Sequence, residues 1–283
     1  MPSTAADLAG RTFIVTGANS GIGRITATTL ARRGAQVFLG CRSVDKAESV
    51  AAPLRAGGAK VEVLALDLAD LASVRDAAAA FLARDLPLHG LINNAGLAGT
   101  RALTRDGFEL TFGVNHLGHF LLTRLLEARL RQSAPARVVN VASAAHRSAK
   151  GIDFTVLREP ARSPGALREY SVSKLANVLF TRELARRWAG SGVTAYALHP
   201  GVVRTGIWRR VPGPLRWLIT RFMISPEEGA GTTIFCATAP ELAGVSGRYY
   251  ERQRESTPSA VAQDDALAAR LWDESEKLVG LPP

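Results

Sequence analysis

Short apolar runs alternate with helical stretches along most of the chain, and this alternation constrains the fold more than any other feature. The apolar runs lie at residues 11–16, 36–41, 61–66, 90–93, 137–141, 193–198 and 248–250. Stretches with helical periodicity follow them, at residues 21–33, 43–55, 71–84, 104–130, 168–187, 226–237 and 264–279. Strands that alternate with helices of this length form βαβ units with right-handed connections.

The apolar runs are nearly continuous, which is typical of parallel strands that are buried on both faces. No internal repeat and no Pro/Gly/Ser-rich linker divides the 283 residues. We therefore predict an α/β fold with a doubly wound parallel sheet, helices on both of its faces, and a single domain over residues 1–283.

Composition and charge exclude several classes of protein. The chain is 47% hydrophobic but has no apolar run of about 18 residues, so we expect no membrane span and a cytoplasmic location. The net charge of +10 comes from scattered arginines rather than from a basic run with aromatics, which argues against nucleic acid as a partner. Cys41 and Cys236 lie far apart without metal-ligand spacing, so we expect no metal site.

A glycine-rich turn lies between the first apolar run and the first helical stretch. Gly17, Gly21 and Gly23 follow a GxxxGxG spacing instead of the common GxGxxG. Glycine adopts positive φ and lets the backbone approach a phosphate, which the free N–H groups of the next helix can bind. Strand, glycine turn and helix together predict a dinucleotide-binding loop. The other residues that we assign to this loop are Asn19, Ser20 and Ile22.

The end of the second apolar run distinguishes NAD from NADP. An NAD site places a carboxylate there to accept a hydrogen bond from the ribose 2′-hydroxyl. Here the run ends in Gly40-Cys41-Arg42, and the nearest acid, Asp45, lies further along in the next helix. Because a guanidinium can bind a phosphate through two hydrogen bonds, Arg42 predicts NADP(H) as the cofactor.

Four polar residues are candidates for catalysis. Tyr170 and Lys174 are spaced i,i+4 and share one helix face. A tyrosine is a poor base at neutral pH, and a nearby ammonium would lower its pKa so that it can exchange a proton with a hydroxyl group. Ser143 follows the fifth run, at the sheet edge where it could hydrogen-bond a substrate oxygen. Asn115 lies in the 104–130 stretch, where a poor helix former indicates a polar role.

These residues occur in the order and at the spacings of the short-chain dehydrogenase/reductase family, which the sequence resembles over about residues 10–250. The resemblance implies a Rossmann-like fold with a seven-stranded parallel sheet. The motifs that carry it are residues 16–23, Asn93-Asn94-Ala95-Gly96, Asn115, Ser143, Tyr170 with Lys174, and His199-Pro200-Gly201.

The resemblance also implies how the cofactor would be held. Asp67 and Leu68 would lie near the adenine, and Asn115 would hold a water in a proton relay to Lys174, which would also bind the nicotinamide ribose. Further cofactor contacts would come from Asn93, Ala95, Gly96, Tyr170, Pro200, Gly201, Val202, Val203 and Thr205.

Within the family, the Gly-Cys-Arg at 40–42, the VNHLGHF at 114–120 and the ASAAH at 142–146 are most similar to the retinol dehydrogenase-like branch. Many members of that branch carry an N-terminal membrane anchor or WW modules, and we expect neither here. Family resemblance further implies a homodimer that pairs through the helices at 104–130 and 168–187.

The irregular segment at about 202–224 follows the sixth run and is expected to form a wall of the active site. Trp208, Trp217 and Phe222 would form an apolar lid over the substrate. Two other interpretations of residues 215–224 stay open, namely part of the core or a weak membrane-surface element. His146, three residues after Ser143, would line the same pocket or lie on a surface loop.

We therefore predict an NADP(H)-dependent oxidoreductase that interconverts an alcohol and an aldehyde or ketone, with an apolar carbonyl compound as its small-molecule substrate. Tyr170 would be the acid/base, with Ser143 on the same substrate oxygen. The alternative is a non-catalytic NADP(H)-binding regulator or scaffold. The complete set of four polar residues argues against it, because a sensor needs no proton relay.

Overall fold

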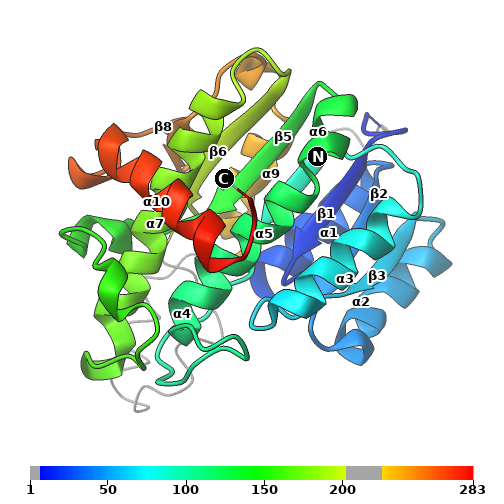
Figure 1. Cartoon of the computed structure of the whole chain (residues 1–283). Coiled ribbons are helices and arrows are strands. Elements are labelled where there is room, and N and C mark those ends of the chain that lie inside the picture. Colours follow the sequence, from blue (N-terminus) through cyan, green and yellow to red (C-terminus); the bar gives the residue numbers. More distant parts are fainter. Residues whose placement is uncertain (1–6, 202–224, 283) are drawn as a thin grey trace.

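The structure is a computed structural model that describes residues 7–201 and 225–282. Its centre is a single sheet with the strand order β3-β2-β1-β4-β5-β6-β7-β8 (Figure 1). Neighbouring strands from β3 to β7 are all parallel. The strands are β1 (Thr12–Thr16), β2 (Gln36–Cys41), β3 (Val61–Ala65), β4 (Gly90–Asn93), β5 (Ala136–Val141), β6 (Val193–His199), β7 (Arg248–Glu251) and β8 (Arg254–Glu255). The predicted α/β class and parallel sheet are confirmed.

The strand count differs from the seven expected, because β8 adds a short eighth strand that pairs antiparallel with β7. A two-residue turn joins the two strands, and both of its residues, Arg252 and Gln253, have positive φ (50° and 61°). Such turns usually carry Asn-Gly or Asp-Gly, so the sequence Arg-Gln gave no hairpin signal.

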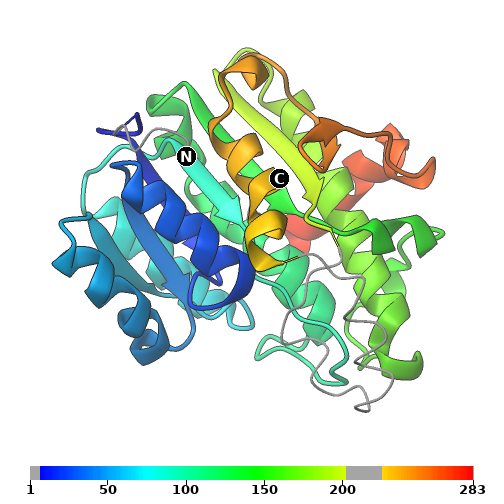
Figure 2. The same ribbon diagram turned by 180° about the vertical axis from the view of Figure 1, so that it is seen from behind.

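Helices cover both faces of the sheet. One face carries α1 (Gly21–Arg32), α2 (Val44–Ala56) and α9 (Pro226–Thr238), as Figure 2 shows from behind. The other face carries α3 (Leu71–Leu82), α5 (Gly118–Leu125), α7 (Leu167–Arg187) and, packed on α7, α10 (Asp265–Leu278) (Figure 1). The shorter α4 (Leu110–Phe112) and α6 (Glu127–Gln132) flank α5 in the chain.

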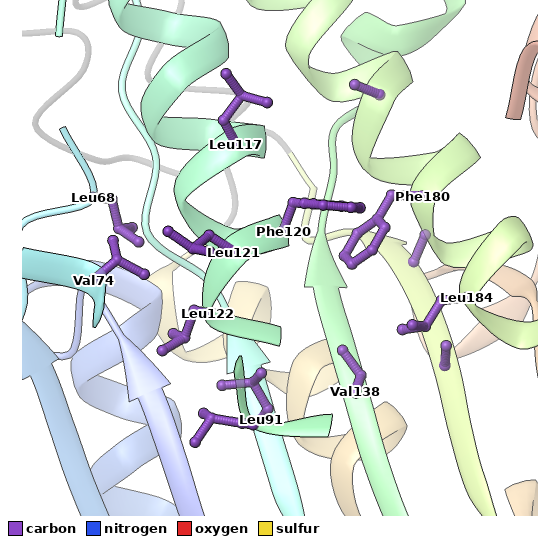
Figure 3. Close-up of a cluster of buried hydrophobic side chains, with 14 of the residues drawn as sticks. Leu68, Val74, Leu91, Leu117, Phe120, Leu121, Leu122, Val138, Phe180 and Leu184 are labelled. Atoms are coloured by element: carbon purple, nitrogen blue, oxygen red, sulfur yellow. The ribbon is translucent and has the colours of Figure 1, made fainter. Parts of the chain in front are cut away.

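Each face has its own hydrophobic core. The core under α5 and α7 contains Leu121, Phe120 and Phe180; in Figure 3 the two phenylalanines lie side by side, and Leu121 lies toward Leu68 and Val74. The core under α1, α2 and α9 contains Val15, Leu30 and Cys236. Because both faces are covered, the central strands are fully buried, which explains their continuous apolar sequences.

The helix predicted over residues 104–130 is broken in the structure. Leu103 pairs with Glu109 in an isolated bridge, and α4 begins only at Leu110. A π-helical segment, Gly113–Leu117, follows and leads into α5. A π turn inserts one extra residue, and such turns often occur at functional sites. Directly after this segment, Gly118 lies so close to Leu68 that a Cβ on it would be 2.7 Å from the Leu68 carbonyl oxygen.

In the parts of the chain that the structure describes, no helix is long and apolar enough to cross a membrane. Cys41 and Cys236 are both buried free thiols. Within the same residues, no three side chains of the metal-binding types come together.

Candidate cofactor and catalytic site

The strand order reverses between β1 and β4, and in open α/β sheets ligands bind beyond the carboxyl ends of the strands at this point. The glycine loop follows β1 there. Gly17 and Gly21 have positive φ, 67° and 52°. A Cβ on Gly23 would lie 2.4 Å from the Gly17 carbonyl oxygen and from Asn94 Nδ2. The loop is therefore too compact for a side chain at Gly23.

Thr16 joins the glycine loop to the turn after β4. Its Oγ1 accepts hydrogen bonds from the N–H groups of Asn94 and Ala95, each at 2.9 Å. Asn94 Nδ2 donates back to the Thr16 carbonyl at 2.8 Å. Sequence reasoning did not assign a role to Thr16 or Asn94, although their positions at two adjacent strand ends could have suggested one.

The N-terminus of α1 fits a phosphate group. Ser20 precedes the helix, but its side chain makes no capping hydrogen bond within the described chain, and the first helical turn contains no acidic residue. The first N–H groups of α1 are thus free to bind an anion, and the helix dipole favours this. Arg42 is exposed at the end of β2, on the next strand of the sheet. The glycine loop and the start of α1 fit the phosphates of a dinucleotide.

Other predicted cofactor residues have mixed environments. Asp67 Oδ1 accepts from the Ala69 N–H at 3.0 Å, and the Leu68 side chain packs in the core beneath α5 (Figure 3). The Asn93 side chain is buried, and its Nδ2 lies 3.0 Å from Thr123 Oγ1 and 2.8 Å from Asn140 Oδ1. Its Oδ1 has no hydrogen-bond partner among the described residues. The Asn93 side chain thus joins β4 to α5 and β5.

Tyr170, Ser143 and Lys174 come together at the carboxyl end of β5. The Ser143 hydroxyl lies close enough to the Tyr170 hydroxyl to lower the pKa of that phenol. Lys174 is 3% exposed, and its Nζ donates to the Val141 carbonyl at 2.8 Å and lies 5.7 Å from the centre of the Tyr170 ring. A Cβ on Gly96 would lie 3.4 Å from Lys174 Nζ. The turn after β4 therefore passes close to Lys174.

The electrostatics differ from the sequence argument in one respect. Burial lowers the pKa of Lys174 to about 8. The pKa of Tyr170 is raised because the ring is buried, and its hydrogen bond to Ser143 opposes this only in part. We expected the ammonium to lower the pKa of Tyr170, and the opposite direction is found. The cause is the burial of Tyr170, and Lys174 Nζ donates its hydrogen bond to the Val141 carbonyl.

Asn115 lies in the π-helical segment and is fully buried. Its Oδ1 accepts from the Leu97 N–H at 2.9 Å, and its Nδ2 donates to the Leu97 carbonyl and to Ser173 Oγ, each at 3.0 Å. The side-chain amide thus ties the segment after β4 to α7, one residue before Lys174.

His146 does not lie on a surface loop, which corrects one of the two expectations for it, whereas its place in the substrate pocket stays a prediction. The residue is completely buried, and its ring packs against Tyr249 at 5.0 Å between centroids. Nε2 accepts from the Ser259 N–H at 3.1 Å, so Nδ1 carries the hydrogen and donates to the Ser143 carbonyl at 2.7 Å. His146 therefore fixes the backbone that carries Ser143.

The last predicted residues lie at the end of β6. His199 pairs in register with Glu251, and Gly201 has a positive φ of 94°. Val202, Val203, Thr205, Trp208, Trp217 and Phe222 lie outside the described residues, as does the whole expected substrate segment. A hollow of about 640 Å³ is lined by residues such as Phe154, Val172 and Arg270. Tyr170, Ser143 and Lys174 are not among its lining residues.

Comparisons with known proteins agree with this geometry. Residues 11–156 match the family model described as short chain dehydrogenase. The chain is 46% identical to human retinol dehydrogenase 13 over 98% of its own length and 86% of the relative. A crystal structure of an uncharacterised protein from Mycobacterium paratuberculosis has a TM-score of 0.78 and 38% identity, covering 99% of this chain and 98% of that one. A structure described as an NAD(P)-dependent gluconate 5-dehydrogenase from Beutenbergia cavernae, with bound NADP, has a TM-score of 0.71 and 32% identity, covering 87% and 96%.

Proposed function

Because the chain belongs to the short-chain dehydrogenase family, in its retinol dehydrogenase-like group, we propose that it reduces apolar aldehydes or ketones with NADPH. It is an oxidoreductase that acts on alcohol and carbonyl groups, and in this proposal Tyr170 is the proton donor. The observation that carries this proposal is the contact of Tyr170 with Ser143 beside the buried ammonium of Lys174.

The hydroxyl groups of Tyr170 and Ser143 have different roles at the substrate oxygen. When bound, the reduced nicotinamide supplies the hydride that adds to the carbonyl carbon. Tyr170 gives its phenolic proton to the oxygen as negative charge develops there, and Ser143 donates a hydrogen bond to the same oxygen. A raised pKa keeps Tyr170 protonated at neutral pH, which suits the reductive direction.

Lys174 and Asn115 would restore the proton that Tyr170 gives up. Lys174 is a strong candidate for the next group in the relay, because a pKa of about 8 lets it exchange protons near neutral pH. The Asn115 side chain makes its hydrogen bonds to Leu97 and Ser173, so a relay water would be held by the Asn115 carbonyl oxygen.

Preference for NADP(H) rests on Arg42. Arg42 follows β2 beside the glycine loop and is exposed. An NAD site needs a carboxylate at the end of this strand, but the strand ends in Gly40 and Cys41. The NADP in the related structure from Beutenbergia cavernae supports this choice. An apolar substrate is supported by the name of the human relative, since retinol is an apolar alcohol.

The first experiment measures consumption of NADPH and NADH with a panel of aldehydes and ketones of increasing apolar length, with retinaldehyde among them. We expect turnover with NADPH and a kcat/KM for NADPH well above that for NADH. If NADPH binds tightly and no carbonyl compound is reduced, the chain is the non-catalytic regulator instead. The cytoplasmic location and the homodimer stay predictions.

A further inference from the structure

A second buried histidine, His119, lies between the glycine loop and Asn115. It is carried by α5 and is 2% exposed. Its Nε2 is 2.8 Å from Thr16 Oγ1, and its Nδ1 is 3.1 Å from the Asn115 carbonyl oxygen. One imidazole thus contacts both the strand end that begins the glycine loop and the residue expected in the proton relay.

The direction of each hydrogen bond follows from its neighbours. Thr16 Oγ1 already accepts from the N–H groups of Asn94 and Ala95, which uses both of its lone pairs. Its own hydrogen must therefore be donated, and His119 Nε2 at 2.8 Å is nearer than the Ile92 carbonyl at 3.4 Å. A carbonyl only accepts, so His119 Nδ1 carries the ring hydrogen and donates it to Asn115. The neutral ring with hydrogen on Nδ1 satisfies every group.

The ring is neutral near pH 7 because its pKa is lowered. Burial and the positive charge of Lys174 together lower the pKa of His119 to about 4, against the hydrogen bond to the Asn115 carbonyl, which raises it. The groups that face the ring in this network are Thr16 from β1, the Asn115 carbonyl and Lys174 from α7. Because it does not gain a proton, His119 has no acid/base role.

Its two contacts hold two parts of the site in place. The Asn115 side chain is used by Leu97 and Ser173, so the carbonyl is the acceptor left on this residue. His119 Nδ1 donates to that oxygen and so fixes the backbone at Asn115. At its other end, His119 fixes the Thr16 hydroxyl, which in turn holds the turn at Asn94 and Ala95.

We propose that His119 is a positioning residue that couples the cofactor loop to the proton relay through one neutral imidazole. This inference rests on the proposed function, since it assigns the two ends to cofactor binding and proton transfer. It adds to the site a residue that acts through Thr16 and Asn115.

Two variants separate the two contacts. The amide of His119→Gln is long enough to accept from Thr16 but gives up the donor near Asn115, whereas His119→Asn keeps a donor near Asn115 and is too short to reach Thr16. We expect His119→Gln to lower kcat about tenfold with KM for NADPH little changed, and His119→Asn to raise KM and Kd for NADPH about tenfold with kcat little changed.

His116 provides the matched control. It is also buried, three residues before His119, but its Nε2 is 2.9 Å from Ser275 Oγ in α10 and its ring packs against Phe112 and Phe180. His116→Gln and His116→Asn should lower Tm, and neither should change kcat alone or the KM for NADPH alone. If both His119 variants change kcat and KM in the same proportion, or change neither, the inference is overturned.

Further variants keep the test decisive. If a His119 variant does not fold, Thr16→Val and Thr16→Ser are tested in its place. In an NADPH titration, Thr16→Val should bind about tenfold more weakly, and Thr16→Ser should bind like the wild-type protein. Tyr170→Phe is assayed alongside. Retained turnover in that variant contradicts the proposed function, whereas its loss together with unaltered His119 variants contradicts only the role of His119.

Discussion

The nucleotide end and the catalytic end of this site are built by different means. At the nucleotide end, backbone shape is decisive: Gly17 and Gly21 have positive φ, and Gly23 leaves no room for a Cβ. At the catalytic end, buried side chains are decisive, since Asn115 and Lys174 are 0% and 3% exposed and make their hydrogen bonds inside the protein. Adding an atom should therefore damage the first end, and removing one should damage the second.

The largest effect is expected for removal of the Tyr170 hydroxyl. Tyr170→Phe should lower kcat at least about a hundredfold, because the proton donor is lost, while the Kd for NADPH stays nearly the same. Tyr196→Phe is the control, because the hydroxyl of this buried residue donates to the Leu242 carbonyl. That variant should be less stable and equally active, and a large loss of kcat in it would contradict the division between the two ends.

Gly23→Ala tests the nucleotide end by adding one carbon. Its Cβ would lie 2.4 Å from the Gly17 carbonyl oxygen, so the loop must open and NADPH binding should weaken more than about tenfold. In the control Gly57→Ala, after α2, the added Cβ meets no atom closer than 3.4 Å. Titration of both variants with NADPH gives the comparison, and equal affinities would show that the loop is not set by this contact.

Arg42→Ala tests how the same end distinguishes cofactors. Loss of the guanidinium should raise KM for NADPH about tenfold and leave that for NADH almost unchanged, because only NADPH carries the 2′-phosphate. Arg55→Ala, at the other end of α2 and paired with Glu48, should change neither value. Similar changes for both cofactors in Arg42→Ala would remove Arg42 as the phosphate-binding residue.

The smallest effect is on stability, at Lys174. Its pKa falls from 10.5 to about 8 on folding, so below pH 8 the folded protein buries a charge that the unfolded chain exposes to water. Lys174→Met should thus increase the free energy of unfolding at pH 7 by about 1 kcal/mol, after the loss of the Val141 hydrogen bond.

That gain should shrink as the pH rises from about 8 to 10.5, because the folded wild-type protein then holds a neutral amine at lower cost. Urea unfolding at several pH values measures it, with the exposed Lys150→Met as the control. A gain that does not depend on pH would mean that the buried charge is not its cause.

Most of the nucleotide end could be predicted from the sequence, because strand, glycine turn and helix are local features. The alternation of strands and helices also gave the parallel sheet. Missing were the features that depend on distant contacts. The π turn at Asn115 has no compositional signal, and β8 pairs through a turn without the usual residues.

The catalytic end shows the same limit. His146 binds the Ser259 N–H, 113 residues away, and His119 contacts Thr16, 103 residues away. Lys174 Nζ donates to the Val141 carbonyl, 33 residues before it, and burial of Tyr170 raises the pKa of that side chain. Tertiary packing creates these contacts, so residue spacing alone could not predict them.

The central claim is that this site transfers hydride from NADPH to a carbonyl carbon, and transfer of an isotope label tests it most directly. The protein is incubated with NADPH that carries deuterium at the transferable position and with an apolar aldehyde that it turns over or binds, and the product is examined by mass spectrometry. We predict an alcohol with one deuterium on its carbinol carbon, absent with Tyr170→Phe. The account is contradicted if NADPH binds but keeps its deuterium, and every aldehyde and ketone of the panel is recovered unchanged. The chain would then be a protein that binds the cofactor without catalysis.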